Sequence, residues 1–115
     1  MTRLRTIDSP PDYSHLAIDG RLDVEGVGHI ESPLTEATAA RGKPVMLDMA
    51  GVSFLGSLGI GLLVRCAVSL NRRGAKIVLF NCGPFVRKTL EISKVTAVLP
   101  ILDSEAAARE ALAGA

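Results

Sequence analysis

Short apolar stretches alternate along the chain with stretches of helical periodicity, and this order predicts an α/β fold. The segment Thr2–Ile7 alternates polar and apolar residues, which is typical of a strand, and His15–Ile18 followed by Arg21–Leu22 predicts a second strand. The proline-containing break Ser9–Asp12 separates them. The two strands are therefore expected to pair in antiparallel fashion.

The next segment, Asp23–Ala40, places apolar residues every three or four positions, which predicts a helix with Asp23 as its N-cap. Pro33 lies inside this pattern and leaves two interpretations open, because proline removes a helical hydrogen bond. The segment forms one helix, or a short helical turn is followed by a longer helix that begins near Ser32 with Pro33 at its first position.

Strands and helices continue to alternate in the rest of the chain. The predicted strands are Pro44–Met49, whose exit forms a turn over Gly51–Gly56, then Lys76–Phe80 and Val98–Leu102. The predicted helices are Ser57–Arg73, ended by a left-handed Gly74, then Pro84–Ser93, and Glu105–Leu112, capped by Ser104. Residues 1–115 are thus expected to form a single α/β domain, with a mixed sheet of about four to five strands covered by about four helices.

Composition narrows the functional classes. The chain has 115 residues, a formal net charge of +1 and only 3% aromatic residues. Near-neutral charge argues against non-specific nucleic-acid binding, and the lack of aromatic residues argues against base stacking. The longest uncharged run, Met49–Val64, has 16 residues, whereas a membrane-spanning helix needs roughly 20. The N-terminus has no apolar signal region, so we expect a soluble, cytoplasmic protein.

Few residues form a pattern that carries chemistry. Cys66 and Cys82 each lie in an apolar stretch, which predicts reduced core thiols. No His, Cys, Asp or Glu cluster has metal-ligand spacing, and no cofactor motif is found. A serine hydrolase would need a late histidine base, whereas His15 and His29 lie early and are expected at the surface. Asp48, inside a predicted strand, is expected to hydrogen-bond a neighbouring loop or to lie near a strand end. An enzyme is therefore not expected.

The glycine-rich junction Gly56–Gly61 lies between a predicted strand and the longest predicted helix. Unpaired N–H groups at a helix N-terminus favour an anion, and glycines let a ligand approach closely. In the simpler interpretation Ser57 only caps the helix, and the glycines only allow tight packing.

Charge is uneven around this junction. Residues 1–57 hold 5 basic and 8 acidic side chains, and residues 58–115 hold 8 and 4. These charges indicate either solvated helix surfaces, with cations near helix C-termini, or a positive rim that recognises an acidic partner.

Three segments in order resemble the STAS domain of bacterial anti-sigma factor antagonists. The central one is VMLDMAGVSFLGSLGIGLL at Val45–Leu63, similar to the family pattern V-x-L-D-L-x-x-V-x-F followed by D-S-[ST]-G-L-G-x-L-L. Gly20–Asp23 (GRLD) resembles the family's G-E-L-D, and Asn81–Ile92 resembles its N-x-x-P-x-V-x-R-x-L segment. The resemblance covers about residues 14–112.

The resemblance implies a regulatory binding protein. The phosphoacceptor serine of the family matches Ser57 in this sequence. The partner that the resemblance implies is an anti-sigma factor with serine kinase activity. The unphosphorylated antagonist would bind that partner and free a sigma factor, and phosphorylation would release it. The surface expected to contact the partner comprises Asp23, Gly56, Ser57, Leu58 and Gly59.

Two positions depart from the family pattern. Gly56 replaces the usual Asp, and Leu58 replaces Ser or Thr. The loss of a carboxylate beside the hydroxyl leaves an alternative open, in which the domain is an interaction module without phosphorylation, within a signalling scaffold or a lipid-transport complex.

Overall fold

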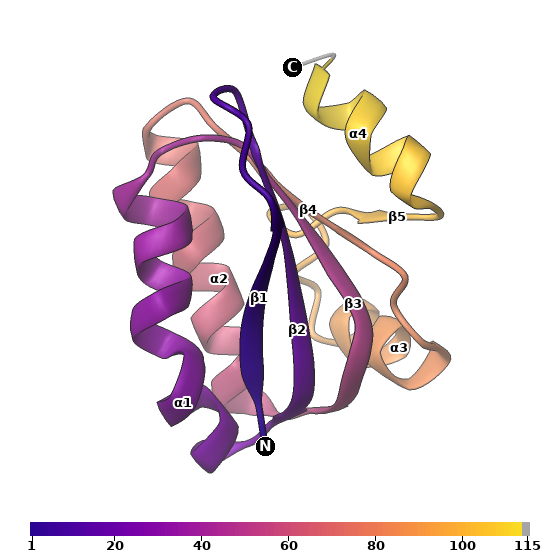
Figure 1. The fold of residues 1–115 in the computed structure, drawn as a ribbon. Coiled ribbons are helices and arrows are strands. Elements are labelled where there is room, and N and C mark those ends of the chain that lie inside the picture. The colour runs from indigo at the N-terminus through magenta and orange to yellow at the C-terminus, as the bar shows by residue number, and fades with distance from the viewer. Residues whose placement is uncertain (114–115) are drawn as a thin grey trace.

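A computed structural model describes residues 1–113 as a five-stranded sheet flanked by helices (Figure 1). The strands lie in the order β1-β2-β3-β4-β5, with β1 antiparallel to β2 and the other neighbours parallel. Their bounds are Arg3–Asp8 for β1, Ser14–Leu22 for β2, Val45–Leu55 for β3, Ile77–Phe80 for β4 and Ile101–Leu102 for β5. The predicted antiparallel pair and mixed sheet are confirmed.

Helices cover both faces of this sheet. They are α1 (Val24–Thr35), which continues into a π-helical segment η1 (Glu36–Ala40), then α2 (Ser57–Arg72), α3 (Pro84–Ile92) and α4 (Glu105–Ala113). In Figure 1, α1 and α2 lie side by side against one face, and α4 lies on the opposite side. None of the helices in residues 1–113 has the length and apolar character needed to cross a membrane.

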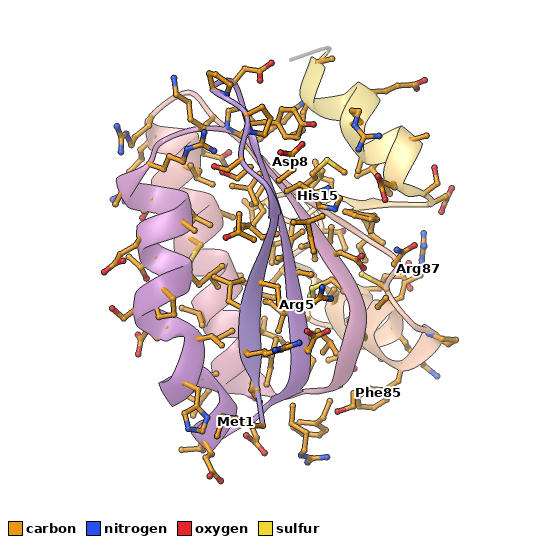
Figure 2. All side chains as sticks on the ribbon, in the orientation of Figure 1. Met1, Arg5, Asp8, His15, Phe85 and Arg87 are labelled. Atoms are coloured by element: carbon orange, nitrogen blue, oxygen red, sulfur yellow. The ribbon has the colours of Figure 1, made fainter. Side chains whose placement is uncertain are left out.

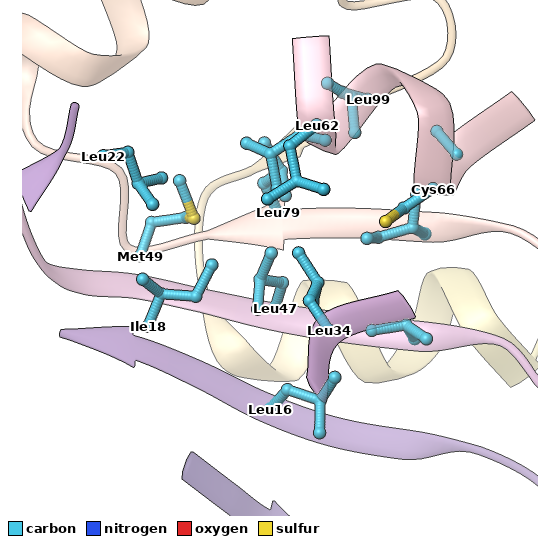
Figure 3. Close-up of a cluster of buried hydrophobic side chains, with 14 of the residues drawn as sticks. Leu16, Ile18, Leu22, Leu34, Leu47, Met49, Leu62, Cys66, Leu79 and Leu99 are labelled. Atoms are coloured by element: carbon cyan, nitrogen blue, oxygen red, sulfur yellow. The ribbon is translucent and has the colours of Figure 1, made fainter. Parts of the chain in front are cut away.

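The core follows from the alternation of side chains along the central strand β3. Leu47 and Met49 point to the side of α1 and α2, where they join Ile18 and Leu62 in the main apolar cluster (Figure 3). Met46 points the other way, into a smaller cluster covered by α4. Burial of both faces explains why this strand reads as a continuous apolar run.

Strand β3 extends through Gly51, where a turn was predicted, so that prediction was wrong. The register between β2 and β3 shifts at this point, and Asp19 lies opposite Gly51. A Cβ atom on Gly51 would overlap the Asp19 carboxylate. The glycine therefore serves close approach of the neighbouring strand rather than a change of chain direction.

Helix α1 continues through Pro33, and the alternative of a new helix starting near Ser32 is wrong. Pro33 has no N–H to donate to the His29 carbonyl one turn earlier. Both residues are exposed, so water can bind that carbonyl instead. On the opposite side Ile30 and Leu34 are buried, and this burial favours an unbroken helix.

The last strand is shorter than the predicted Val98–Leu102. The backbone N–H groups of Val98 and Leu99 both donate to the Val95 carbonyl, at 3.1 and 3.0 Å. Because these donors are used locally, the ladder with β4 contains only Ile101 and Leu102. The predicted caps are confirmed, since Gly74 has a φ of 77° and Ser104 Oγ accepts from Ala107 N–H at 3.0 Å.

One histidine also differs from expectation. His29 is exposed as predicted, but His15 on β2 is only 6% exposed. Its ring lies 5.6 Å from that of Phe80, on the sheet face beneath α4 (Figure 2). The prediction was wrong because local sequence does not reveal that a C-terminal helix covers this face.

Candidate functional site

Ser57 is the first residue of α2, and its side chain is exposed. The N-cap is Gly56, whose extended backbone has φ −100° and ψ 179° and whose carbonyl accepts the Ile60 N–H at 3.0 Å. The interpretation of Ser57 as a side-chain cap is therefore wrong, because the helix begins at Ser57 itself, one residue earlier than a serine cap requires. The Ser57 hydroxyl instead lies at a helix start that lacks a side-chain cap.

A shallow hollow of about 200 Å³ surrounds this hydroxyl and brings together four of the five predicted surface residues. It is lined by Asp23, Val24, Phe54, Gly56, Ser57 and Leu58. These residues meet because β2 and β3 are parallel and end at the same edge of the sheet, each followed directly by a helix. Val24 and Leu58 are 74% and 52% exposed and give the rim an apolar character.

Gly59, the fifth predicted residue, is buried beneath the hollow. A Cβ atom there would lie 2.7 Å from Leu22 Cβ and 2.9 Å from the Leu22 carbonyl oxygen. The glycine thus lets α2 approach the end of β2 closely, and it sets the position of Ser57 from below.

Asp23 is held as a carboxylate at the start of α1. Its Oδ1 accepts the Gly26 N–H at 2.8 Å, which confirms the predicted N-cap, and its Oδ2 accepts Arg21 Nε at 3.2 Å. The backbone hydrogen bond, followed by the arginine, lowers the pKa of this carboxyl below its usual range. A second and larger hollow, of about 420 Å³, lies beside Asp23 and extends to His29.

Acidification should therefore weaken the fold through Asp23. Because the folded pKa lies below the unfolded one, its contribution is complete above the unfolded pKa and is lost as the pH falls through the folded value. Asp23→Asn keeps a capping oxygen but does not titrate. We expect urea midpoints of wild type and variant to converge between pH 7 and pH ~3. If the urea midpoints of wild type and Asp23→Asn change in parallel with pH, the Asp23 carboxylate does not contribute to stability in this way.

Aromatic contacts border the hollow, and sequence reasoning missed them. The Arg21 guanidinium lies 4.5 Å above the centre of the Phe54 ring, and that ring lies 6.2 Å from the Phe85 ring, nearly parallel to it. A Cβ on Gly56 would stand 3.1 Å from Phe54 Cε2, so the glycine leaves room for this ring. The available signal was one aromatic residue close to the start of each helix: Phe54 lies two residues before the cap of α2, and Phe85 lies in the first turn of α3.

Other predicted residues lie elsewhere. Asp48 accepts the side-chain N–H of Asn81 at 3.3 Å, which confirms its bond to a neighbouring loop. Both cysteines are free thiols, and burial raises the pKa of Cys82 to about 11. Within residues 1–113, no group of three His, Cys, Asp or Glu side chains is placed to hold a metal ion.

The basic excess is partly neutralised within the fold. Arg65 pairs with Glu31 at 3.3 Å, and Arg87 pairs with Asp103 at 3.4 Å. Arg72 lies in the last turn of α2, where the helix dipole favours a cation.

Comparison with known proteins places this geometry in a family. The anti-sigma-B factor antagonist of Listeria monocytogenes is 23% identical over 94 residues, covering 82% of each chain. An anti-sigma factor antagonist structure from Mycobacterium paratuberculosis has a TM-score of 0.82 at 19% identity and covers 96% of this chain and 95% of that one. Unphosphorylated SpoIIAA, an anti-sigma factor antagonist, has a TM-score of 0.69 at 20% identity, with 99% and 96% coverage. The family model of the STAS domain matches residues 5–108, and the chain therefore belongs to the STAS domain family.

Proposed function

We propose that the protein is an anti-sigma factor antagonist switched by phosphorylation of Ser57. In its unphosphorylated form it binds an anti-sigma factor with serine kinase activity and frees a sigma factor in the cytoplasm. The names of its relatives support this role: the Listeria protein is an anti-sigma-B factor antagonist. SpoIIAA has been solved in both unphosphorylated and phosphorylated forms.

The observation that carries the proposal is the exposed Ser57 hydroxyl within an apolar-rimmed hollow at the start of α2. A kinase can reach this hydroxyl without unfolding the domain, because the side chain neither caps the helix nor lies in the core. The same hollow offers Val24 and Leu58 to a docked partner. One small surface thus serves both for docking and as the modified site.

Phosphorylation would act on the interface rather than on the fold. A phosphoserine carries about −1.5 to −2 charges, and at a helix N-terminus a negative charge is favourable by roughly 0.3–1 kcal/mol. The domain should therefore keep its structure. In a docked complex the phosphate would lie against Leu58 and near the Asp23 carboxylate, where desolvation and like-charge repulsion disfavour it. The partner would then dissociate.

Incubation with the cognate anti-sigma factor kinase, ATP and Mg²⁺ tests the switch. We expect intact-mass spectrometry to show the addition of one phosphate, and peptide mapping to place it on Ser57. The matched controls are Ser57→Ala, which should remain unmodified, and Ser53→Ala, which removes a nearby exposed serine and should be modified like wild type. A phosphate on another residue, or none, would refute the proposed switch.

A second function is favoured by the two departures at the site. Gly56 places no carboxylate beside the hydroxyl, and Leu58 makes the surface more apolar. In this alternative the domain is a docking module that is never phosphorylated, within a signalling scaffold or a lipid-transport complex. Affinity capture from native cells distinguishes the two functions: a partner without a kinase domain, together with an unmodified Ser57, favours the module.

A further inference from the structure

The outer face of α3 carries an exposed stripe that the proposed switch does not use. Phe85, Lys88 and Ile92 follow one another at spacings of three and four residues, so they share one side of the helix. Phe85 and Ile92 are 57% and 68% exposed. Their buried neighbours Val86 and Leu90 hold the helix on the core. The stripe therefore belongs to a fixed surface.

This stripe is continuous with the surface around Ser57. Phe54 lines the hollow at Ser57, and its ring stacks on Phe85 at 6.2 Å. Figure 2 shows Phe85 at the same end of the molecule as Met1. In residues 1–113, six large apolar side chains are strongly exposed. Three of them, Val24, Leu58 and Phe85, lie at the hollow or stack on its lining, and Ile92 follows on the same side of α3, seven positions after Phe85. Apolar exposure thus extends from the hollow along the outer side of α3, as expected for a docking surface.

The charges on and just after α3 indicate what kind of partner could bind the stripe. Arg87 is engaged by Glu91 and Asp103, at 3.6 and 3.4 Å. No carboxylate in residues 1–113 lies within 4.0 Å of the Lys88 or Lys94 ammonium group. Lys94 also has a φ of 58°, a left-handed conformation that is unusual for a long side chain. The stripe therefore presents apolar contacts beside Lys88, and Lys94 follows two residues after the end of α3; the described residues offer neither lysine a carboxylate partner.

We propose that α3 is a second contact for the anti-sigma factor, which would meet Phe85 and Ile92 with an apolar patch and Lys88 and Lys94 with acidic side chains. This inference rests on the proposed function. A second copy of this chain fits the stripe poorly, because self-pairing would bring the lysines together. An anionic membrane also fits poorly, since two lysines alone give only weak attraction to a charged lipid surface.

The two contacts would have different roles in binding and in phosphorylation. Phosphate at Ser57 opposes docking at the hollow, whereas the α3 contact contains no modified residue. The α3 stripe would therefore set affinity in the unphosphorylated state and hold the kinase while it modifies Ser57. Loss of this contact should reduce binding and slow phosphorylation together, without changing which residue is modified.

The test measures binding of the unphosphorylated full chain to the anti-sigma factor by isothermal titration. We expect Phe85→Ala and Lys88→Glu each to weaken binding by about tenfold or more, with the effect of Lys88→Glu shrinking at high salt. Lys43→Glu is the matched control, because Lys43 is an exposed lysine preceding β3 and outside this surface. Its affinity should equal that of wild type. Urea midpoints establish that each variant remains folded.

The outcomes separate this inference from the function on which it rests. If Ser57→Asp abolishes binding while the α3 variants bind like wild type, the second contact is wrong and the function stands. If the α3 variants and Lys43→Glu weaken binding equally, only general charge matters and the inference is also overturned. Lys88-dependent binding to phosphatidylserine vesicles, with no loss of affinity for the anti-sigma factor, would assign the stripe to a membrane instead.

Discussion

Ser57→Asp should lose about 100-fold in affinity for the anti-sigma factor, equivalent to roughly 2.7 kcal/mol, while its fold remains intact. The introduced carboxylate would lie in the hollow next to Asp23 and against Leu58, where a bound partner excludes water. Two carboxylates in a desolvated interface repel each other, and burial of an unpaired charge costs further free energy. Isothermal titration against the purified anti-sigma factor measures the loss.

Two variants separate charge at this site from other causes. Ser57→Ala removes the hydroxyl without adding charge and should bind within about threefold of wild type. Ser32→Asp adds the same charge at an exposed serine on α1, outside the hollow, and should leave affinity unchanged. The thermal midpoint of Ser57→Asp should not fall, because a negative charge is favourable in the first turn of α2. If Ser57→Asp binds the anti-sigma factor as tightly as wild type does, the hollow is not the docking site.

Gly26→Ala should destabilise the domain by about 3 kcal/mol, and Gly28→Ala, two residues further along the same helix, should not. A Cβ on Gly26 would overlap the Arg21 carbonyl oxygen, which is itself held by the Thr2 hydroxyl at 2.6 Å. The helix cannot shift freely to relieve the overlap, because its residues Val27, Ile30 and Leu34 are buried in the core. Urea unfolding monitored by circular dichroism gives the difference.

Gly28 provides the matched comparison. No atom lies within 4 Å of a Cβ built on it. Replacement of an exposed helical glycine by alanine should stabilise the domain by about 0.5–1 kcal/mol. Opposite signs for two identical substitutions would show that close approach at the start of α1, and not helix propensity, decides the outcome. Equal effects would contradict that interpretation. The distinction matters for function because α1 carries Asp23 and Val24 to the edge of the hollow.

Local patterns were enough to predict most of the fold. Period-two and helical periodicity record which side chains meet the core, so the order of strands and helices could be read before any tertiary contact was known. The errors arose where a distant segment decides. Gly51 was expected in a turn, but pairing with Asp19 keeps it in a strand. His15 was expected at the surface, but α4, which begins at Glu105 far along the chain, covers it.

Some residues of the candidate site could likewise be predicted from local sequence, and others depend on distant segments. Ser57 and Asp23 were identified by their resemblance to family motifs, and parallel pairing of β2 with β3 brings them to one hollow. The stack of Phe54 on Phe85 joins residues 31 positions apart, on different elements, and no local pattern records that contact. Capping by Gly56 instead of Ser57 depends on backbone angles, which the presence of a serine alone does not set.

The most direct test compares the affinity of the anti-sigma factor for two forms of the same chain, one unmodified and one stoichiometrically phosphorylated on Ser57. The proposed switch predicts tight binding of the unmodified form and a dissociation constant about 100-fold higher for the phosphorylated form, with superimposable far-ultraviolet circular dichroism spectra. Equal affinities, or tighter binding of the phosphorylated form, would contradict the switch.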